Sequence, residues 1–364
     1  MRVAGLMSGT SLDGIDAALV DLRGHGDHLR IKSLGFVSIP YPKRIRERLL
    51  AVSNRDCHTR DIARLNFELP RLYARAIAKL PAKPQLIGCH GQTIYHEARV
   101  CSLQIGDGSV LAELTGAPVI ANFRPRDIAA GGHGAPLAPF FDYRVFRHPT
   151  RGRVALNLGG IGNLTAIPPR ATPRDIVAFD TGPGNMVIDQ LTARHTNGRL
   201  TFDRDARLAR RGHLHPELLD ELLRENSYYR QRPPKSAGRE QYGVDFIERL
   251  LSIGLPLLDL IATATAFTAA TVADQIRRFV APRQPVDDLI VSGGGARNPL
   301  LMAYLAGFLP HTRIQTSADY GVDPDAKEAI FFALLAYEAF HGRTNNLPAA
   351  TGARRSVRLG QLAW

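Results

Sequence analysis

The sequence predicts an α/β protein whose two halves follow one plan. Apolar, strand-like segments alternate with helical segments along most of the chain. Residues 2–22 and 153–167 also share a layout of strand, small-residue turn and strand, which indicates an internal duplication. With 364 residues, the chain is long enough for two domains with separate cores. We place the junction within 125–150, where the glycine-rich run 131–136 interrupts regular structure.

The first half is expected to open with strands 3–7 and 15–22, which form a hairpin with a tip of small polar residues. A helical stretch over 61–80 contains Pro70, which predicts a break or kink there. The remaining expected elements are an extended run at 31–39, a basic amphipathic helix at 42–52, strands at 86–90, 102–105 and 118–121, and a helix at 109–115.

The second half is expected to be more helical. A long helix near 255–280 has apolar residues at spacings of three and four, which mark one buried face. The other expected elements are strands at 153–158, 164–167, 176–179 and 289–292, and helices at 218–223, 298–308 and 326–340.

Composition narrows the classes of function. The hydrophobic fraction of 45% is ordinary for a globular protein, no apolar stretch approaches the length of a membrane span, and a signal-peptide pattern is lacking. We therefore expect a cytoplasmic protein with no membrane partner. Cys57, Cys89 and Cys101 lack CxxC spacing, which favours a reducing compartment over disulfides or zinc. The net charge is +12, but the arginines are scattered without interleaved aromatics, so no nucleic-acid partner is expected.

Three glycine-rich turns are the strongest functional signals. The first, residues 8–16, combines hydroxyls and backbone N–H groups that suit an anion, and Asp13 or Asp16 beside it suits Mg²⁺, directly or through water. In the second, Asp180 ends a buried strand and a glycine-rich turn then opens a helix. The third, residues 292–298, offers bare backbone for a flat ring such as adenine. Each could be an ordinary structural turn, and none matches the Walker or GxGxxG pattern.

Together these motifs resemble those of the anhydro-N-acetylmuramic acid kinase family, which belongs to the superfamily of acetate and sugar kinases, actin and heat-shock chaperone ATPases. The most specific strings are Met-Ser-Gly-Thr-Ser-Leu-Asp-Gly-Ile-Asp, ending at Asp16, and Phe-Asp-Thr-Gly-Pro-Gly-Asn, ending at Asn185. Further matching strings lie at 91–94, 103–107, 123–136, 157–160, 234–240, 293–298, 325–329, 346–348 and 351–353. His133 and Ala237 depart from the family's usual Gln and Thr, which puts the details of sugar contact in doubt.

The resemblance implies two similar lobes of the actin-like ATPase fold, with a duplicated sheet core and an active-site cleft between the lobes. The N-terminal lobe would comprise 1–130 plus about 345–364, and the C-terminal lobe 131–344. The implied reaction uses ATP, Mg²⁺ and water to open the 1,6-anhydro bridge of 1,6-anhydro-N-acetylmuramic acid and to phosphorylate O6. Its products, N-acetylmuramate 6-phosphate and ADP, belong to peptidoglycan recycling. Whether the protein forms a homodimer stays an open question at this point.

The resemblance also assigns roles to individual residues. Asp180 would be the base that activates water. The nucleotide and phosphate would contact Gly9, Thr10, Ser11, Leu12, Asp13, Gly14, Ile15, Asp16, Gly160, Gly182, Gly184, Asn185, Gly293, Gly294, Gly295 and Asn298. The sugar would contact His90, Gln92, Thr93, Arg124, Asp127 and Glu328.

Several of these residues have structural alternatives. His90 also suits a buried core histidine, and Arg124 with Asp127 a surface ion pair. Glu328 stands three residues after Asp325, which is capping-box spacing at a helix start.

Three other functions stay open at this stage. One is a non-catalytic ATP-dependent switch of the same fold, since fold alone does not specify activity. Another is a basic nucleic-acid binder, whose affinity should fall steeply with salt. Within the enzyme class, the alternative is a kinase for another sugar.

Overall fold

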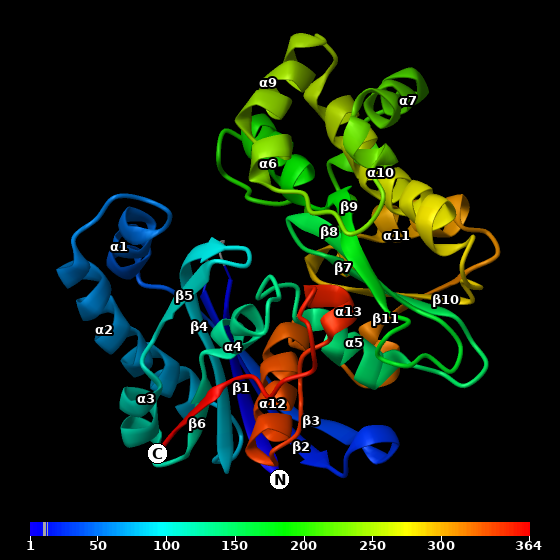
Figure 1. Cartoon of the computed structure of the whole chain (residues 1–364). Coiled ribbons are helices and arrows are strands. Elements are labelled where there is room, and N and C mark those ends of the chain that lie inside the picture. Colours follow the sequence, from blue (N-terminus) through cyan, green and yellow to red (C-terminus); the bar gives the residue numbers. More distant parts are fainter. Residues whose placement is uncertain (10–11, 13) are drawn as a thin grey trace. The chain divides into compact units, whose positions relative to one another are not determined.

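The computed structural model describes residues 1–9, 12 and 14–364, with Asp27 and Arg239 described by their backbone alone. The chain divides into two compact units (Figure 1). Unit 1 comprises Met1–Val145 and Ala326–Trp364, and unit 2 comprises Phe146–Asp325. Two separate lobes were expected, but their boundaries differ. Residues 131–145 and 326–344, expected in the second lobe, belong to unit 1 because the helix over 327–340 covers its sheet.

A mixed sheet forms the centre of unit 1. Among the described residues it has seven strands in the order β12-β6-β4-β1-β2-β3, with β5 beside β4. β1 is antiparallel to β2 and parallel to β4, so the expected opening hairpin is confirmed. The strands are β1 (Arg2–Ser8), β2 (Gly14–Arg23), β3 (Arg30–Pro40), β4 (Leu86–Glu97), β5 (Cys101–Ile105), β6 (Val119–Ala121) and β12 (Gln361–Ala363).

Helices cover both faces of this sheet, because alternate residues of a strand point to opposite sides. Ala4 and Leu6 lie in the core that includes residues of α1, α2 and α3. Gly5, between them, faces α12, and a Cβ there would lie 1.7 Å from the carbonyl oxygen of Ala329. The helices of unit 1 are α1 (Lys43–Val52), α2 (Thr59–Ala78), α3 (Gly108–Thr115), α4 (Phe123–Ala129), α5 (Ala138–Phe146), α12 (Lys327–Phe340) and α13 (Pro348–Thr351), with a short turn η1 (Gly26–His28).

Pro70 does not break α2, so the expectation of a broken helix is wrong. The helix runs on for two turns beyond the proline, which is itself buried. Leu65, Leu69 and Tyr73 on the same helix are almost fully buried in the core. Packing of this face therefore outweighs the cost of a proline in the helix interior, about 3 kcal/mol.

Unit 2 has a smaller mixed sheet, with the order β11-β10-β7-β8-β9 among the described residues. Its strands are β7 (Arg153–Leu158), β8 (Ile161–Ile167), β9 (Val177–Pro183), β10 (Asp288–Ser292) and β11 (Arg313–Thr316). Its helices are α6 (Met186–His195), α7 (Pro216–Glu225), α8 (Arg239–Tyr242), α9 (Val244–Ser252), α10 (Leu257–Gln275) and α11 (Pro299–Phe308). Short 3-10 turns are η2 (Arg204–Ala206), η3 (Ala209–Arg211), η4 (Ser227–Arg230), η6 (Gly294–Arg297) and η7 (Ser317–Tyr320), and the π-helical segment η5 (Ile276–Val280) continues α10. Like β1–β2, the pair β7–β8 is antiparallel, which agrees with the expected duplication.

The long helix α10 is buried on nearly every side rather than along one stripe. Ala269, Val272 and Ala273 pack against the sheet core, and Ile261, Ala264 and Phe267 pack among the surrounding helices. In the described part of the chain, 257–280 is the one helical segment long and apolar enough to span a membrane, and most of it is buried inside unit 2. Such burial is typical of a core helix.

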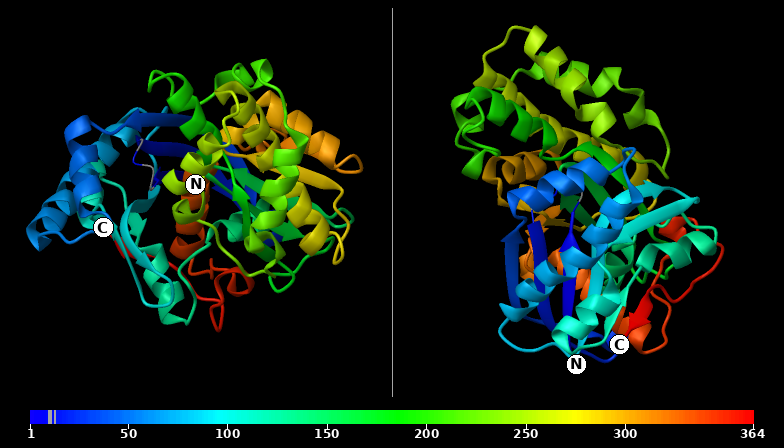
Figure 2. Two further views of the ribbon diagram at one scale, coloured as in Figure 1. Left: turned by 90° about the horizontal axis from the view of Figure 1, so that it is seen from above. Right: turned by 90° about the vertical axis from the view of Figure 1, so that its left-hand side faces the viewer.

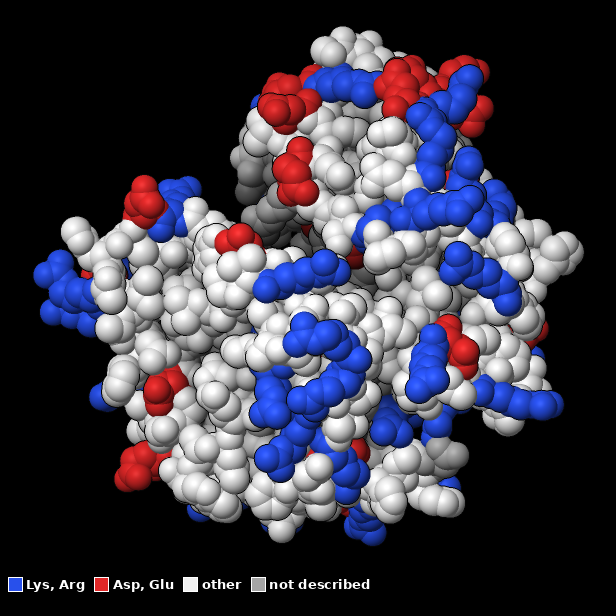
Figure 3. Space-filling model, viewed as in Figure 1, with Lys and Arg blue, Asp and Glu red and all other residues white. Residues whose placement is uncertain are grey.

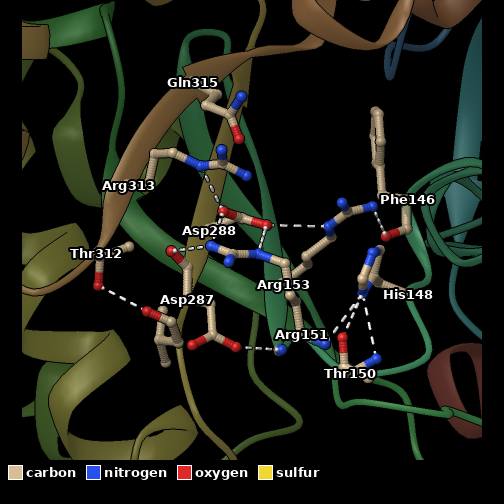
Figure 4. Close-up of polar contacts among 12 residues, drawn as sticks. Phe146, His148, Thr150, Arg151, Arg153, Asp287, Asp288, Thr312, Arg313 and Gln315 are labelled. Atoms are coloured by element: carbon tan, nitrogen blue, oxygen red, sulfur yellow. Dashed lines mark hydrogen bonds and ion pairs between the residues drawn. The ribbon is translucent and has the colours of Figure 1, made fainter.

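An ion cluster stabilises the start of β7, β10 and β11 in unit 2 (Figure 4). The fully buried Asp288 carboxylate accepts bonds from Arg151 (2.6 and 2.8 Å), Arg153 (3.1 Å) and Arg313 (2.9 Å). Burial alone would raise the pKa of this carboxyl, but the arginine bonds outweigh burial and hold it well below its ordinary value. The cluster lies at the strand ends opposite to the glycine-rich turns.

Acidic and basic side chains are interspersed over much of the face in Figure 3. Lys and Arg gather over the α13 and C-terminal region of unit 1, where Arg354, Arg355 and Arg358 are exposed. Both termini belong to unit 1, at its lower end in the right-hand view of Figure 2.

Candidate active site

The first glycine-rich turn lies between β1 and β2 in unit 1. Thr10, Ser11 and Asp13 fall outside the described residues, so their expected roles stay predictions. The carbonyl oxygen of Gly9 accepts bonds from the Leu12 N–H (3.2 Å) and from Gln92 Nε2 (3.1 Å). Leu12 is buried with a φ of 59°, an uncommon conformation for a residue with a side chain. Unfavourable backbone conformations of this kind concentrate at ligand sites.

A buried polar network holds this turn against β4. The fully buried Gln92 accepts a bond from the Tyr41 hydroxyl (3.3 Å) while it donates to Gly9. Ser8 Oγ donates to the Gly91 carbonyl (3.2 Å) and lies 3.4 Å from the Tyr73 hydroxyl. Gln92 therefore binds the first glycine-rich turn, and its expected contact with sugar stays a prediction. Sequence reasoning missed Tyr41 and Tyr73, because nothing in their local pattern distinguishes them from core aromatics.

His90 and Arg124 lie together, and His90 is buried, which agrees with its alternative role as a core histidine. The expected contacts of both residues with sugar stay predictions. Arg124 Nε and Nη2 lie 3.1 and 3.0 Å from His90 Nε2, and Nη1 donates to the Gly134 carbonyl (2.8 Å). Burial, and then the Arg124 charge, hold the pKa of His90 well below its ordinary value, so its ring is a neutral acceptor. Burial lowers the pKa of Arg124 to about 10, which leaves it charged at pH 7.

Strand β4 is longer than the sequence suggested. It continues to Glu97, so Gln92 and Thr93 lie within the strand and not in a turn after it. Thr93 is half-buried, and its hydroxyl accepts a bond from Gln104 on β5 (3.2 Å). The pairing of β4 with β5 explains the extension, because β5 continues the ladder past Gly91.

Asp127 is fully buried, and its carboxylate binds the protein itself. Oδ1 accepts from Asn346 (2.9 Å) and Thr351 (2.8 Å), and Oδ2 accepts from the Gly134 N–H (2.9 Å). The predicted surface ion pair with Arg124 is wrong, because Asp127 has no exposed surface. Asp127 therefore shapes the 131–136 loop, and its expected contact with sugar stays a prediction.

Glu328 lies on the first turn of α12 with an exposed side chain. The capping-box alternative is wrong: the helix N-cap is Ala326 without a side-chain cap bond, and the Asp325 carboxylate pairs with Arg297 instead. Glu328 is electrostatically coupled to Asp16 on β2 and to Arg124. A contact of Glu328 with sugar, water or metal therefore stays a prediction.

In unit 2, two turns are bound to each other at the ends of β7 and β9. The Gly160 carbonyl accepts bonds from the N–H groups of Gly184 (2.9 Å) and Met186 (3.1 Å), and the Gly159 carbonyl accepts from Asn185 (2.8 Å). Gly182 and Gly184 are buried, whereas Gly160 is exposed. A Cβ at Gly184 would lie 2.2 Å from the Gly159 carbonyl oxygen. Of these expected phosphate contacts, Gly182 and Gly184 serve packing, and Gly160 presents open backbone.

The third glycine-rich turn follows β10. Gly293 has a φ of 78°, Gly294 is exposed, and Gly295 is buried, where a Cβ would lie 2.5 Å from that of Leu158. The Asn298 side chain accepts bonds from the N–H groups of Leu300 and Leu301 and so caps α11. Gly294 is thus the exposed part of this turn, and the Asn298 side chain caps α11; contacts of both residues with nucleotide stay predictions.

Asp180 lies inside β9, and not in the turn after it, because β9 continues to Pro183 along β8. Asn163 pairs with Asp180 and Gly162 with Gly182, so Thr181 is an extra residue in the ladder. Such bulges redirect side chains and are common beside active sites. Burial raises the pKa of the Asp180 carboxyl to about 6, although a bond from the Ala237 N–H (2.8 Å) to Oδ2 opposes this.

The 226–238 segment binds Asp180 at three points. Besides the Ala237 bond, the Asp180 N–H donates to the Lys235 carbonyl (3.2 Å), and the Tyr228 hydroxyl donates to the Asp180 carbonyl (2.6 Å). The sequence marked 234–240 as a motif but offered no signal for Tyr228. These contacts give the carboxylate a fixed place.

No group of three or more His, Cys, Asp or Glu side chains suited to a metal occurs among the described residues. Cys57, Cys89 and Cys101 are free thiols.

Known proteins resemble the chain over its whole length. The sequence model of the family described as anhydro-N-acetylmuramic acid kinase matches residues 1–364. Proteins named anhydro-N-acetylmuramic acid kinase from Caldanaerobacter subterraneus subsp. tengcongensis and Salinibacter ruber are 41% and 45% identical to it, and each alignment covers 99% of this chain and 96% of the relative. A solved ROK family glucokinase from Streptomyces griseus, in complex with glucose and AMPPNP, aligns with 93% of this chain and 100% of its own at 14% identity and a TM-score of 0.43.

Proposed function

Because the chain belongs to the anhydro-N-acetylmuramic acid kinase family, we propose that it converts 1,6-anhydro-N-acetylmuramic acid, ATP and water into N-acetylmuramate 6-phosphate and ADP. Water adds to C1 of the sugar, the C1–O6 bond breaks, and O6 takes the γ-phosphoryl group. The observation that carries this proposal is the environment of Asp180, a carboxylate held in place with a raised pKa.

Asp180 is the base in this reaction. With a pKa of about 6 it is mostly ionised at pH 7.5, and it is a stronger proton acceptor than an ordinary aspartate. It takes a proton from the attacking water while C1 gains oxocarbenium character, as in an inverting glycosidase. The phosphoryl group captures O6, so the leaving oxygen needs no separate acid.

Phosphoryl transfer needs positioned donors and positive charge more than covalent chemistry. Within unit 2, the exposed backbone at Gly160 and Gly294 offers groups suited to ATP. Gly9 and its neighbours in unit 1 are expected to bind phosphate as well. Mg²⁺ fits here, since it binds proteins through one or two carboxylates and otherwise keeps water and phosphate ligands. Asp16 on β2, next to the phosphate turn, would hold it, with Asp13 as a second ligand. The ion would neutralise charge on the phosphates.

Arg124 is the residue suited to the lactyl carboxylate of the muramic acid. Its guanidinium is charged and partly buried, and contacts with His90 and the Gly134 carbonyl fix its plane. Asp127 stabilises the same loop, because its carboxylate accepts a bond from the Gly134 N–H. A non-catalytic ATP-dependent switch does not need an arginine positioned for a carboxylate. We therefore favour an enzyme that acts on a small amino sugar, and we place it in the cytoplasm.

A coupled ADP-release assay tests the function. We expect turnover with 1,6-anhydro-N-acetylmuramic acid, and none with N-acetylmuramic acid or glucosamine. In H₂¹⁸O the label should enter at C1, with inversion, and not in the phosphate ester. Asp180→Asn should bind ATP as the wild type does while kcat falls by about 10²–10⁴-fold or more. Label in the phosphate ester, or near-normal turnover by Asp180→Asn, would disprove the mechanism.

A further inference from the structure

The segment that holds Asp180 is itself held by one buried lysine. Lys235 is 8% exposed, and its ammonium donates to the Tyr228 carbonyl (3.0 Å) and to Oε1 of Gln275 at the end of α10 (2.5 Å). Gln275 is fully buried and donates in turn to the Tyr229 carbonyl (3.1 Å). The lysine side chain thereby joins both ends of the 226–238 segment to the helix behind it.

Aromatic rings complete the environment of this ammonium. Nζ lies 4.5 Å from the ring centre of Tyr228, 4.7 Å from that of Phe279 and 5.8 Å from that of Phe179. Such contacts attract a cation but not a neutral amine. Its hydrogen-bond partners are two neutral oxygens, and the bonds are stronger while the donor is charged. The anchor therefore depends on the positive charge.

We propose that Lys235 is a positioning residue for Asp180, whose ammonium fixes the 226–238 segment so that the Ala237 N–H holds the reacting carboxylate. The lysine backbone contributes as well, because its carbonyl accepts the Asp180 N–H. Lys235, which holds the segment through its ammonium, is only two residues before Ala237, whose N–H binds the Asp180 carboxylate. This inference rests on the proposed role of Asp180 as the base.

The proposal has a consequence for pH dependence. Burial lowers the pKa of Lys235 to about 8; Asp274 opposes this, and Arg278 adds to it. The other groups that face the ammonium are Tyr228 and, through the backbone, Asp180. As the pH rises through 8 the amine becomes neutral and the anchor weakens. Wild-type kcat/KM for the sugar should therefore have an alkaline limb near pH 8, besides the acidic limb near pH 6 that belongs to Asp180.

The test compares pH profiles of kcat and KM for Lys235→Met and for Arg232→Met, a matched control on the same segment with an exposed side chain. Lys235→Met should lose about 10- to 100-fold in kcat, part of a general base's contribution, with KM for ATP unchanged. Its alkaline limb should vanish. Its acidic limb should move up, because the Ala237 bond that favours the ionised carboxylate is weakened. Arg232→Met should keep both limbs.

A reduced melting temperature with an unchanged pH profile in Lys235→Met would overturn the proposal, because a merely structural lysine predicts that result. If Lys235→Met does not fold, Arg278→Met decides. It removes a nearby positive charge and should shift the alkaline limb to higher pH, and an unmoved limb overturns the proposal. Near-normal turnover by Asp180→Asn would remove the base, and with it this inference. An inactive Asp180→Asn beside an unchanged Lys235→Met profile would refute only the role of Lys235.

Discussion

Replacing Asp180 by Asn should make the protein more stable at neutral pH while it removes activity. Burial raises the pKa of this carboxyl from 3.8 to about 6, so the folded state disfavours the ionised form. That difference corresponds to about 3 kcal/mol at a pH above both values, at about 1.4 kcal/mol for each tenfold change in proton affinity. Asparagine resembles the protonated acid and can still accept the Ala237 bond. The gain in unfolding free energy at pH 7.5 should therefore approach, and not exceed, about 3 kcal/mol.

The sign of the effect sets the design of the assay. A carboxyl with a raised pKa contributes stability below pH 3.8, and this is lost as the pH rises through 6. The advantage of Asp180→Asn should accordingly be full at pH 7.5 and shrink toward pH 4. Urea unfolding followed by circular dichroism measures it, since Trp364, the sole tryptophan, belongs to unit 1. The control is Asp175→Asn in unit 2, whose exposed carboxylate accepts bonds from Thr172 and should give no gain. An equal advantage at both pH values, or none, would refute the reasoning.

Three further substitutions test the structure described above. Asp288→Asn leaves three arginines without their shared carboxylate and should reduce the unfolding free energy by about 3–5 kcal/mol in urea titrations at pH 7; a loss below 1 kcal/mol would contradict the ion cluster. Gly184→Ala places a methyl group against a carbonyl oxygen and should weaken ATP binding about tenfold or more, as measured by calorimetry. A tenfold loss corresponds to only about 1.4 kcal/mol of binding free energy. The control is Gly307→Ala, which has open space around it and should leave ATP binding unchanged. Arg124→Lys loses the planar contacts with its histidine and loop partners and should raise KM for the sugar with KM for ATP unchanged; equal effects on both would argue against a sugar contact.

Sequence patterns predicted the elements better than their ends. Apolar runs identified most strands of both sheets, because each of these strands buries at least one face. The edge strands β11 and β12 were missed, since they are short and mostly not buried. The extension of β9 past Asp180, and of β4 past Gly91, was not predictable from local sequence, since in both cases an antiparallel neighbour continues the ladder through a glycine. Pro70 was misjudged because the packing that keeps α2 intact comes from distant residues.

The residues of the candidate site also differ in how far local sequence could predict them. Glycine-rich turns and Asp180 could be found from sequence because small residues and a carboxylate after a strand form a local pattern. The residues that hold them could not. Tyr41 and Tyr228 act through hydroxyl groups on backbone or amide partners 51 and 48 positions away in the chain. Such pairings exist only once the sheet and its covering segments have assembled.

Synthesis from the N-terminus delays the completion of unit 1, because this unit combines the first and the last segments of the chain. Its sheet begins with β1, yet the helix that fits the bare backbone at Gly5 and Gly88 is α12, made after all of unit 2. Domains usually fold in order of synthesis, N-terminal first. Here unit 2, which is inserted in unit 1, has all its strands synthesised while the sheet of unit 1 still lacks α12 on one face. The nascent N-terminal segment must therefore wait, with an apolar surface open to chaperones or to other chains, until the last tenth or so of the protein has been made.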